Sequence, residues 1–134
     1  MPDFNAASFL EELGLRATRP RQAIARILFA DGQNRHVTAE WLAEEVSQHG
    51  EPVALATIYN TLHSLADAGA LRMVRGTGQD NIVFDTYTQP HHHFLDERTG
   101  ELTDIPDGQL TLGSLPVAPD GRTIAGYDIV IRIR

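Results

Sequence analysis

The first half of the chain repeats apolar residues at the spacing of amphipathic helices, and this pattern limits the fold more than any other feature. Three sets of residues show the spacing: Phe9, Leu10 and Leu13; Ile24, Ile27 and Leu28; Trp41, Leu42 and Val46. Thr18 and Thr38 are the expected N-caps of the second and third segments, because a hydroxyl accepts a hydrogen bond from an amide of the first helical turn. Gly14 is the expected end of the first segment.

A further helix is expected over residues 56–68, with Ile58, Leu62 and Leu65 on its apolar stripe and Gly69 after its last turn. Its other face carries small, hydrogen-bonding side chains: Thr57, Asn60, Thr61 and Ser64. Residues 71–75 and 82–84 flank a glycine-rich turn at residues 76–80, which is typical of a β-hairpin. Helices followed by a hairpin are the order of a winged helix-turn-helix.

Short strand-like runs, separated by glycine and proline, make up the chain after residue 90. The candidate strands are 92–95, 102–105 and 127–133. In the last one, Ile129, Ile131 and Ile133 share a face, which is the pattern of a half-buried strand. A small sheet closed by a C-terminal strand is a common way to build a dimer, because an exposed strand edge in a monomer invites aggregation. The whole pattern predicts an α+β protein.

Composition and charge limit the compartment and the partners. No apolar run approaches the roughly 20 residues that cross a bilayer, and no basic signal-like region begins the chain, so we expect a cytoplasmic protein with no membrane partner. The absence of cysteine excludes disulfides and thiolate metal sites. The net charge of −7 argues against nucleic acid, but residues 14–36 hold five arginines against one aspartate, which allows one basic face.

The helix over residues 56–68 and the nearby arginines together favour DNA binding. Asn60 can form two hydrogen bonds with adenine, and threonine or tyrosine can meet a thymine methyl or a phosphate. Arginines before the second helix suit phosphates or a narrow minor groove, and the wing around Arg75 would touch the adjacent backbone. The predicted DNA contacts are Arg16, Arg19, Arg21, Thr57, Tyr59, Asn60 and Thr61. The alternative is a solvated polar helix face.

Three consecutive histidines, His91, His92 and His93, are the main candidates for a ligand site. In or beside a strand, His91 and His93 would point the same way, about 6.5 Å apart along the chain, and His92 the other way. Imidazole binds both metals and haem. Other candidate ligands are His36, Asp85, Asp104 and Asp107. Nitrogen and carboxylate donors without sulfur suit iron(II), manganese or zinc, whereas a solvated polar loop is the alternative.

Three ordered motifs resemble the ferric uptake regulator family: LRATRPR at 15–21, HVTAE at 36–40, and LATIYNTL at 55–62 followed by DAG at 67–69. Within the family, FDT at 84–86, HHHF at 91–94 and DIVIR at 128–132 resemble the iron response regulator branch of α-proteobacteria. That branch represses or activates iron and haem genes when iron is scarce, and haem status inactivates it.

The resemblance implies a homodimer that binds double-stranded operator DNA. Each chain would have a winged-helix DNA-binding domain at residues 1–86 and a small α/β dimerisation and sensing domain at residues 87–134. The family's regulatory metal site, at the hinge between the domains, maps onto His36, Asp85, His91, His93 and Asp104. In the iron response branch, haem binding is instead associated with the three histidines His91, His92 and His93.

The sequence departs from the family where most members have paired cysteines for a structural zinc. Asp96 and Thr99 stand at the positions of the first pair, so no cysteine-ligated zinc is expected. We therefore predict a dimeric transcription regulator of iron and haem homeostasis that responds to haem or iron status. The alternative is a repressor of the same family activated by iron(II) or manganese. An enzyme is not expected, because no nucleophile and base accompany the histidines.

Overall fold

The computed structural model describes residues 3–74 and 82–134 and divides into two compact units. The helical unit contains the described residues up to 88, and the sheet unit contains residues 89–134. The boundary expected from the resemblance lay between residues 86 and 87. Among the described residues, no helix combines the length and the apolar character that crossing a bilayer requires.

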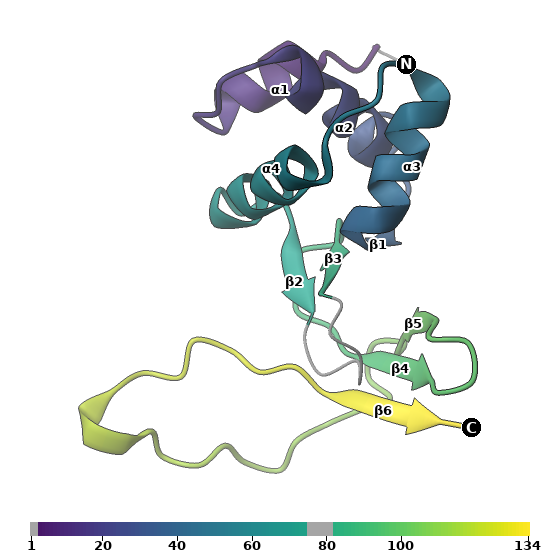
Figure 1. Ribbon diagram of the computed structural model, residues 1–134. Helices are drawn as coiled ribbons and strands as arrows, with labels where there is room; N and C mark the ends of the chain where they lie inside the picture. Colours follow the sequence, from purple (N-terminus) through teal and green to yellow (C-terminus); the bar gives the residue numbers. More distant parts are fainter. Residues whose placement is uncertain (1–2, 75–81) are drawn as a thin grey trace. The chain divides into compact units, whose positions relative to one another are not determined.

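The helical unit begins with four helices (Figure 1): α1 (Ala6–Glu12), α2 (Arg19–Phe29), α3 (Ala39–His49) and α4 (Leu55–Asp67). Both predicted threonine caps are present. The Thr18 hydroxyl accepts a hydrogen bond from the Arg21 amide at 3.4 Å, and the Thr38 hydroxyl accepts one from the Trp41 amide at 3.2 Å. Helix α4 begins one residue before the expected position and has no side-chain cap.

The predicted apolar stripes meet in one core. Its fully buried side chains include Ile24, Leu28, Leu42, Val46, Ile58, Leu62, Leu65 and Phe84. The expectation for Trp41 was wrong, because this side chain, assigned to the apolar face of α3, is 40% exposed. Trp41 lies in the first turn of α3, and the neighbouring Leu42 is the side chain that is buried in the core there.

Three short strands complete the helical unit in the order β1-β3-β2, all antiparallel: β1 (His36–Val37), β2 (Arg72–Val74) and β3 (Val83–Asp85). Strands β2 and β3 confirm the predicted hairpin, and Met73 lies opposite Phe84 in its ladder. Strand β1 was not predicted. The glycine-rich turn and Arg75 lie outside the described residues.

The sheet unit is built from β4 (His93–Asp96), β5 (Leu102–Asp104) and β6 (Val130–Ile133), in the order β5-β4-β6. Strand β5 pairs antiparallel with β4, and β6 pairs parallel with β4. The long segment that connects β5 to β6 contains one 3₁₀ turn, η1 (Pro119–Gly121) (Figure 1). The prediction of a half-buried isoleucine face was wrong for the single chain. Ile131 is 37% and Ile133 is 44% exposed, so the described part of the chain does not bury this face of β6.

The core of the helical unit gives a stability prediction on one helix. Leu62 is fully buried and Leu55 is 43% exposed, and both lie on α4. We expect Leu62→Ala to lower the free energy of unfolding by about 2–5 kcal/mol, because it removes buried methyl groups and leaves a cavity. Leu55→Ala should cost less than about 1 kcal/mol. Denaturant unfolding followed by fluorescence of Trp41, the only tryptophan, measures both, and equal losses would contradict the packing.

Candidate functional site

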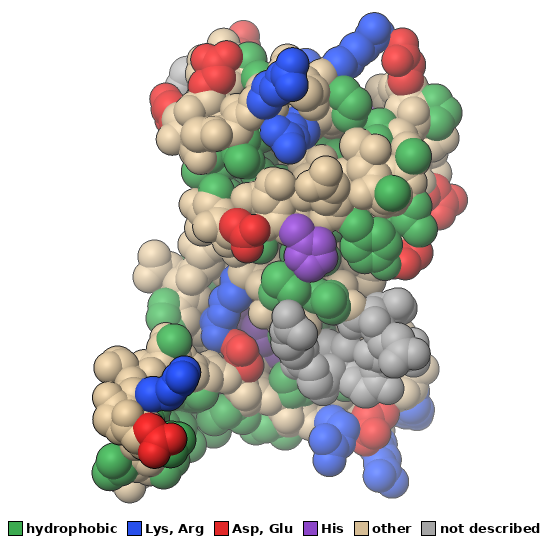
Figure 2. Space-filling view, turned by 60° about the vertical axis from the view of Figure 1, so that its left-hand side comes forward, with side chains coloured by type: hydrophobic (Ala, Val, Ile, Leu, Met, Phe, Trp, Pro, Cys, Tyr) green, Lys and Arg blue, Asp and Glu red, His purple; other side chains and the backbone are tan. Residues whose placement is uncertain are grey.

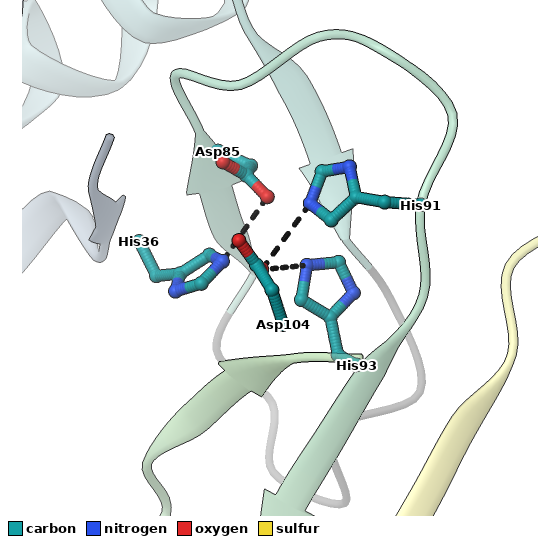
Figure 3. A group of neighbouring side chains, drawn as sticks. All are labelled: His36, Asp85, His91, His93 and Asp104. Atoms are coloured by element: carbon teal, nitrogen blue, oxygen red, sulfur yellow. Dashed lines mark ion pairs between the residues drawn. The ribbon is translucent and has the colours of Figure 1, made fainter. Parts of the chain in front are cut away.

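The helical unit contributes one histidine and one carboxylate. Strands β1 and β3 place His36 directly opposite Asp85, and the His36 Nε2 atom lies 3.1 Å from Asp85 Oδ2 (Figure 3). Asp85 is fully buried, and its other oxygen, Oδ1, accepts a hydrogen bond from the Tyr87 amide at 2.9 Å. This bond orients the carboxylate, so that Oδ2 is directed at the imidazole.

A pair of hydrogen bonds extends the β1–β3 pairing beyond His36 and Asp85. The Arg35 amide donates to the Thr86 hydroxyl at 2.8 Å, and the Thr86 amide donates to the Arg35 carbonyl at 3.0 Å. The Arg35 guanidinium in turn forms a two-point ion pair with Asp31, in which Nη1 lies 2.7 Å from Oδ1. The hydrogen bonds from Arg35 and from the Gln33 amide hold the pKa of Asp31 well below its ordinary value. Neither Thr86 nor Asp31 was singled out from the sequence, because their partners depend on strand pairing and loop conformation.

The sheet unit contributes two histidines and a second carboxylate. His93 lies opposite Asp104 in the β4–β5 ladder, and His91 lies two residues before β4 begins. The Nε2 atoms of His91 and His93 lie 3.3 and 3.4 Å from the same oxygen, Asp104 Oδ1 (Figure 3). Both imidazoles are buried, and their ring centroids are 4.5 Å apart. The predicted alternation is confirmed, since His91 and His93 point to a common partner.

The hydrogen bonding of His91 determines which of its nitrogens faces the carboxylate. Its Nδ1 atom lies 2.6 Å from the Gln89 carbonyl, and a carbonyl can only accept, so Nδ1 carries a proton. In a neutral His91, the Nε2 lone pair therefore faces Asp104 Oδ1. Two lone pairs directed at each other repel, and a cation between them removes the repulsion. A backbone carbonyl that fixes the tautomer in this way is the usual outer partner of a metal-binding histidine.

The spacing of the donor atoms fits a metal ion. Ligands bound at about 2.1 Å lie about 3.0–3.4 Å from one another in octahedral or tetrahedral geometry. The distances are 3.1 Å within the helical unit and 3.3 and 3.4 Å within the sheet unit. Each unit therefore holds its imidazole and carboxylate donors as they would lie around a shared ion. Nitrogen and oxygen donors of this kind suit divalent iron, manganese or zinc.

His92 is separated from these donors. Its Nδ1 atom accepts a hydrogen bond from the Ile129 amide at 3.1 Å, and its ring stacks on Tyr127 with centroids 5.3 Å apart. The sequence grouped His92 with its neighbours as a haem candidate. The structure brings His91 and His93 together with Asp104 and directs His92 to the segment before β6.

Helix α4 presents most of the predicted DNA-contacting side chains. Asn60 is exposed, and Thr57 and Tyr59 are partly exposed. Thr61 is 1% exposed, so the prediction that it lies on the outward face was wrong. It packs beside Leu62 in the stripe that faces the core. This assignment could have been made from helical periodicity, since Thr61 lies three residues after Ile58 and four before Leu65.

A carboxylate that the sequence did not single out contacts the same helix. The Tyr59 hydroxyl donates a hydrogen bond to Glu40 Oε1 at 2.8 Å, and this bond raises the pKa of Tyr59. Glu40 belongs to the first turn of α3, so the contact depends on how α3 packs against α4. The proton of the Tyr59 hydroxyl is thereby engaged within the chain.

The predicted phosphate-contacting arginines lie at and before the start of α2. Arg16 and Arg19 are exposed, and arginine side chains stand on the surface of the helical unit in Figure 2. Arg19 pairs with Glu51 at 2.7 Å, and Arg21 Nη1 donates to the Arg16 carbonyl at 3.2 Å. Among the described residues, Arg16 has no ion pair within 4 Å. Its charge is thus the most available of the three to a phosphate.

Comparison with known proteins identifies similar regulators. Residues 12–118 match the model of the ferric uptake regulator family. The chain is 33% identical over 119 residues to the ferric uptake regulation protein of Klebsiella pneumoniae, covering 88% of this chain and 74% of that protein. It is 33% identical over 101 residues to a peroxide-responsive repressor of Staphylococcus aureus, covering 75% of this chain and 66% of that protein. The solved ferric uptake regulator of Pseudomonas aeruginosa with manganese superposes with a TM-score of 0.71 at 26% identity, over 98% of each chain.

The bond between Arg35 and Thr86 gives a prediction for the helical unit. Thr86→Val removes the acceptor of the Arg35 amide next to the His36–Asp85 pair. We expect the free energy of unfolding to fall by about 1 kcal/mol, because a part-buried donor loses its partner. Thr86→Ser keeps the hydroxyl and serves as the matched control. Denaturant unfolding compares the two variants, and a valine variant as stable as the serine variant would show that the bond contributes nothing.

Proposed function

The chain belongs to the ferric uptake regulator family, and from this membership we propose that it is a dimeric, DNA-binding transcription regulator that senses a divalent metal ion. Members of the family are transcription regulators, so the chain is a regulator and not an enzyme. The helical unit would be the DNA-binding domain, and the sheet unit would provide dimerisation and sensing. Action on an operator places the protein in the cytoplasm.

We propose that one metal site combines His36 and Asp85 with His91, His93 and Asp104. The observation that carries this proposal is the donor spacing of 3.1–3.4 Å in both units. Two or three ligands are too few for an ion that takes four to six, so each set alone is incomplete. The chain also keeps the two sets near each other, because six residues from Asp85 to His91 span at most about 20 Å.

A site shared by both units would connect metal binding to DNA binding. Its ligands flank the junction at residues 88–89, so loading would restrict the angle between the units. The ion supplies positive charge that neutralises the two carboxylates, and the chain supplies the orientation of each donor. Loading can alter DNA affinity only if one arrangement of the dimer binds the ion better than another.

In the proposed dimer, the recognition helices of two copies would read half-sites in successive major grooves. Asn60 and the ring of Tyr59 would meet base edges, and Arg16 would contact phosphate. The exposed isoleucines of β6 would be covered by the second copy, which would explain an apolar face on an edge strand. The net charge of −7 would repel DNA from most of the surface, so contact would be confined to the region of Arg16, Arg19 and Arg21.

The ligand is better matched by a divalent ion than by haem, because haem iron is held by histidine, cysteine, methionine or tyrosine and not by carboxylates. Asp85 and Asp104 are hard donors that suit iron(II), manganese or zinc. Haem bound through His91, His92 or His93, and membership of the iron response regulator branch, stay predictions. Iron(II) or haem as the ligand would make the protein a reporter of iron status.

Metal titration of the purified protein tests the shared site. We expect Asp104→Ala to raise the dissociation constant for manganese or iron(II) roughly tenfold or more, because it removes the oxygen that contacts both imidazoles. Asp107→Ala, an exposed aspartate three residues away, is the matched control and should bind as the wild type does. His36→Ala should weaken binding as Asp104→Ala does. Loss in only one of these two variants would mean that the units do not share an ion.

Operator binding by the same purified protein distinguishes the metal proposal from the haem prediction. If the metal proposal holds, operator binding at fixed salt should require manganese or iron(II) and should not change on addition of haem. A Soret shift that disappears when His91, His92 and His93 are all replaced by alanine, together with haem-dependent operator release, would support haem instead.

Operator binding tests the DNA-contacting residues. We expect Arg16→Ala to weaken binding on all sequences and to reduce the dependence on salt by about one phosphate contact. Tyr59→Ala should cost about 1–3 kcal/mol on the operator and less on unrelated DNA, because it removes a base contact. Arg122→Ala, an exposed arginine of the sheet unit, is the control for a general loss of charge. Wild-type affinity of Tyr59→Ala at matched salt would contradict base contact by α4, and wild-type affinity of Arg16→Ala would contradict phosphate contact by the segment before α2.

A further inference from the structure

The middle histidine of the run has a role of its own in the sheet unit. His92 Nδ1 accepts a hydrogen bond from the Ile129 amide at 3.1 Å, and the ring stacks on Tyr127 with planes 20° apart. Because Nδ1 is an acceptor, a neutral His92 carries its proton on Nε2 and has no lone pair left to bind a metal. His92 would have to release Ile129 before it could act as a ligand through Nδ1.

The backbone around His92 holds the same region together. The Ile129 carbonyl accepts a hydrogen bond from the His93 amide at 3.1 Å, so Ile129 is bound at its amide by the His92 ring and at its carbonyl by the next residue. On the other side, the His92 carbonyl accepts a hydrogen bond from the Ile105 amide at 2.8 Å, immediately after the ligand Asp104. His92 thus contacts both chain segments that border β4.

Strand β6 needs such an attachment more than β5 does. Strand β5 follows β4 through a short antiparallel connection, whereas β6 returns after residues 105–129 and pairs in parallel. Closing a long segment without helical support costs entropy, and a short edge strand whose two side-chain faces are both largely exposed has little to specify its register. A slip by one residue would exchange the faces of Ile131 and Arg132. A side chain that binds the Ile129 amide selects one register.

We propose that His92 is a positioning residue that fixes the register of β6 and connects it to the metal ligands His91, His93 and Asp104. This coupling rests on the proposed function, in which those residues bind an ion and β6 faces a second copy. Loading of the ligands on either side of His92 would order the peptide groups that hold Ile129, and so stabilise β6. Register and metal affinity are then linked, and each improves the other by the same factor.

Two substitutions separate positioning from ligation. In His92→Asn, the Oδ1 atom is bonded to Cγ as Nδ1 is in histidine, so it can still accept a hydrogen bond from the Ile129 amide. The asparagine lacks the imidazole ring. In His92→Leu, a side chain of similar bulk has no acceptor. Hydrogen exchange of the Ile129 amide, measured by NMR on the full chain without metal or DNA, reads the bond directly.

We expect the Ile129 amide to exchange roughly fivefold faster in His92→Leu, as for the loss of one ordinary hydrogen bond, and at close to the wild-type rate in His92→Asn. Unchanged exchange in the leucine variant, or equal acceleration in both variants, would overturn the proposal. If the leucine variant does not fold, the asparagine variant decides: wild-type exchange supports positioning, and faster exchange overturns it.

Manganese addition then tests the coupling. Bound manganese broadens nearby NMR signals, so exchange is followed here by mass spectrometry. We expect manganese to slow amide exchange in residues 130–133 of the wild type and of His92→Asn, and to have no such effect in His92→Leu. Equal slowing in all three proteins would overturn the coupling. If manganese does not bind the wild type, the proposed metal function fails, while the exchange of Ile129 without metal still reports on positioning.

Discussion

Two antiparallel strand pairs each place a histidine opposite an aspartate, and the proposed chemistry depends on this register. His36 faces Asp85 across β1 and β3, and His93 faces Asp104 across β4 and β5. Directly opposed residues have Cβ atoms about 5 Å apart, so their ligand atoms meet at 3.1 and 3.4 Å without long side chains. A slip by one residue in either ladder would send the pair to opposite faces. The bond from the Arg35 amide to the Thr86 hydroxyl lies beside the first ladder, and the bond from the Ile105 amide to the His92 carbonyl lies beside the second, so both resist such a slip.

The helical unit was largely predictable because its signals are local. The hydroxyls of Thr18 and Thr38 each accept a hydrogen bond from the amide three residues later, which is enough to begin a helix. Glycine likewise ends a helix without contacts from distant residues. The alternation of the histidine run was also a local property, and it placed His91 and His93 on a common partner. Which carboxylate they would meet required either the family resemblance or the β4–β5 pairing. Spacing along the chain does not connect residues 91 and 104.

Apart from Thr61, whose burial follows from helical spacing, the features that escaped prediction depend on tertiary contacts. Thr61 is polar and was assigned to the outer face, but its position on α4 between Ile58 and Leu65 directs it inward. Glu40 contacts Tyr59 only because α3 packs against α4. The exposure of Ile131 and Ile133 on β6 depends on whether another element covers that face, which alternation along the chain does not show. The polarity of a side chain predicts whether it is usually buried or exposed, whereas the elements packed against it determine its actual environment.

The sheet unit has a small apolar core, and this makes ligand binding a source of its stability. Among residues 89–134, the buried apolar side chains are Leu95, Leu102 and Ile105, and the absence of cysteine excludes a thiolate-bound zinc. A unit of this size buries too little apolar surface to be stable by packing alone. Its order must then draw on strand pairing, on the bond from His92, and in the proposed function on a metal ion and a second copy. An ion that binds only the folded unit adds its binding free energy to folding. In the proposed function, sensing would need no separate switch, because metal occupancy itself would determine how well the dimerisation surface is formed.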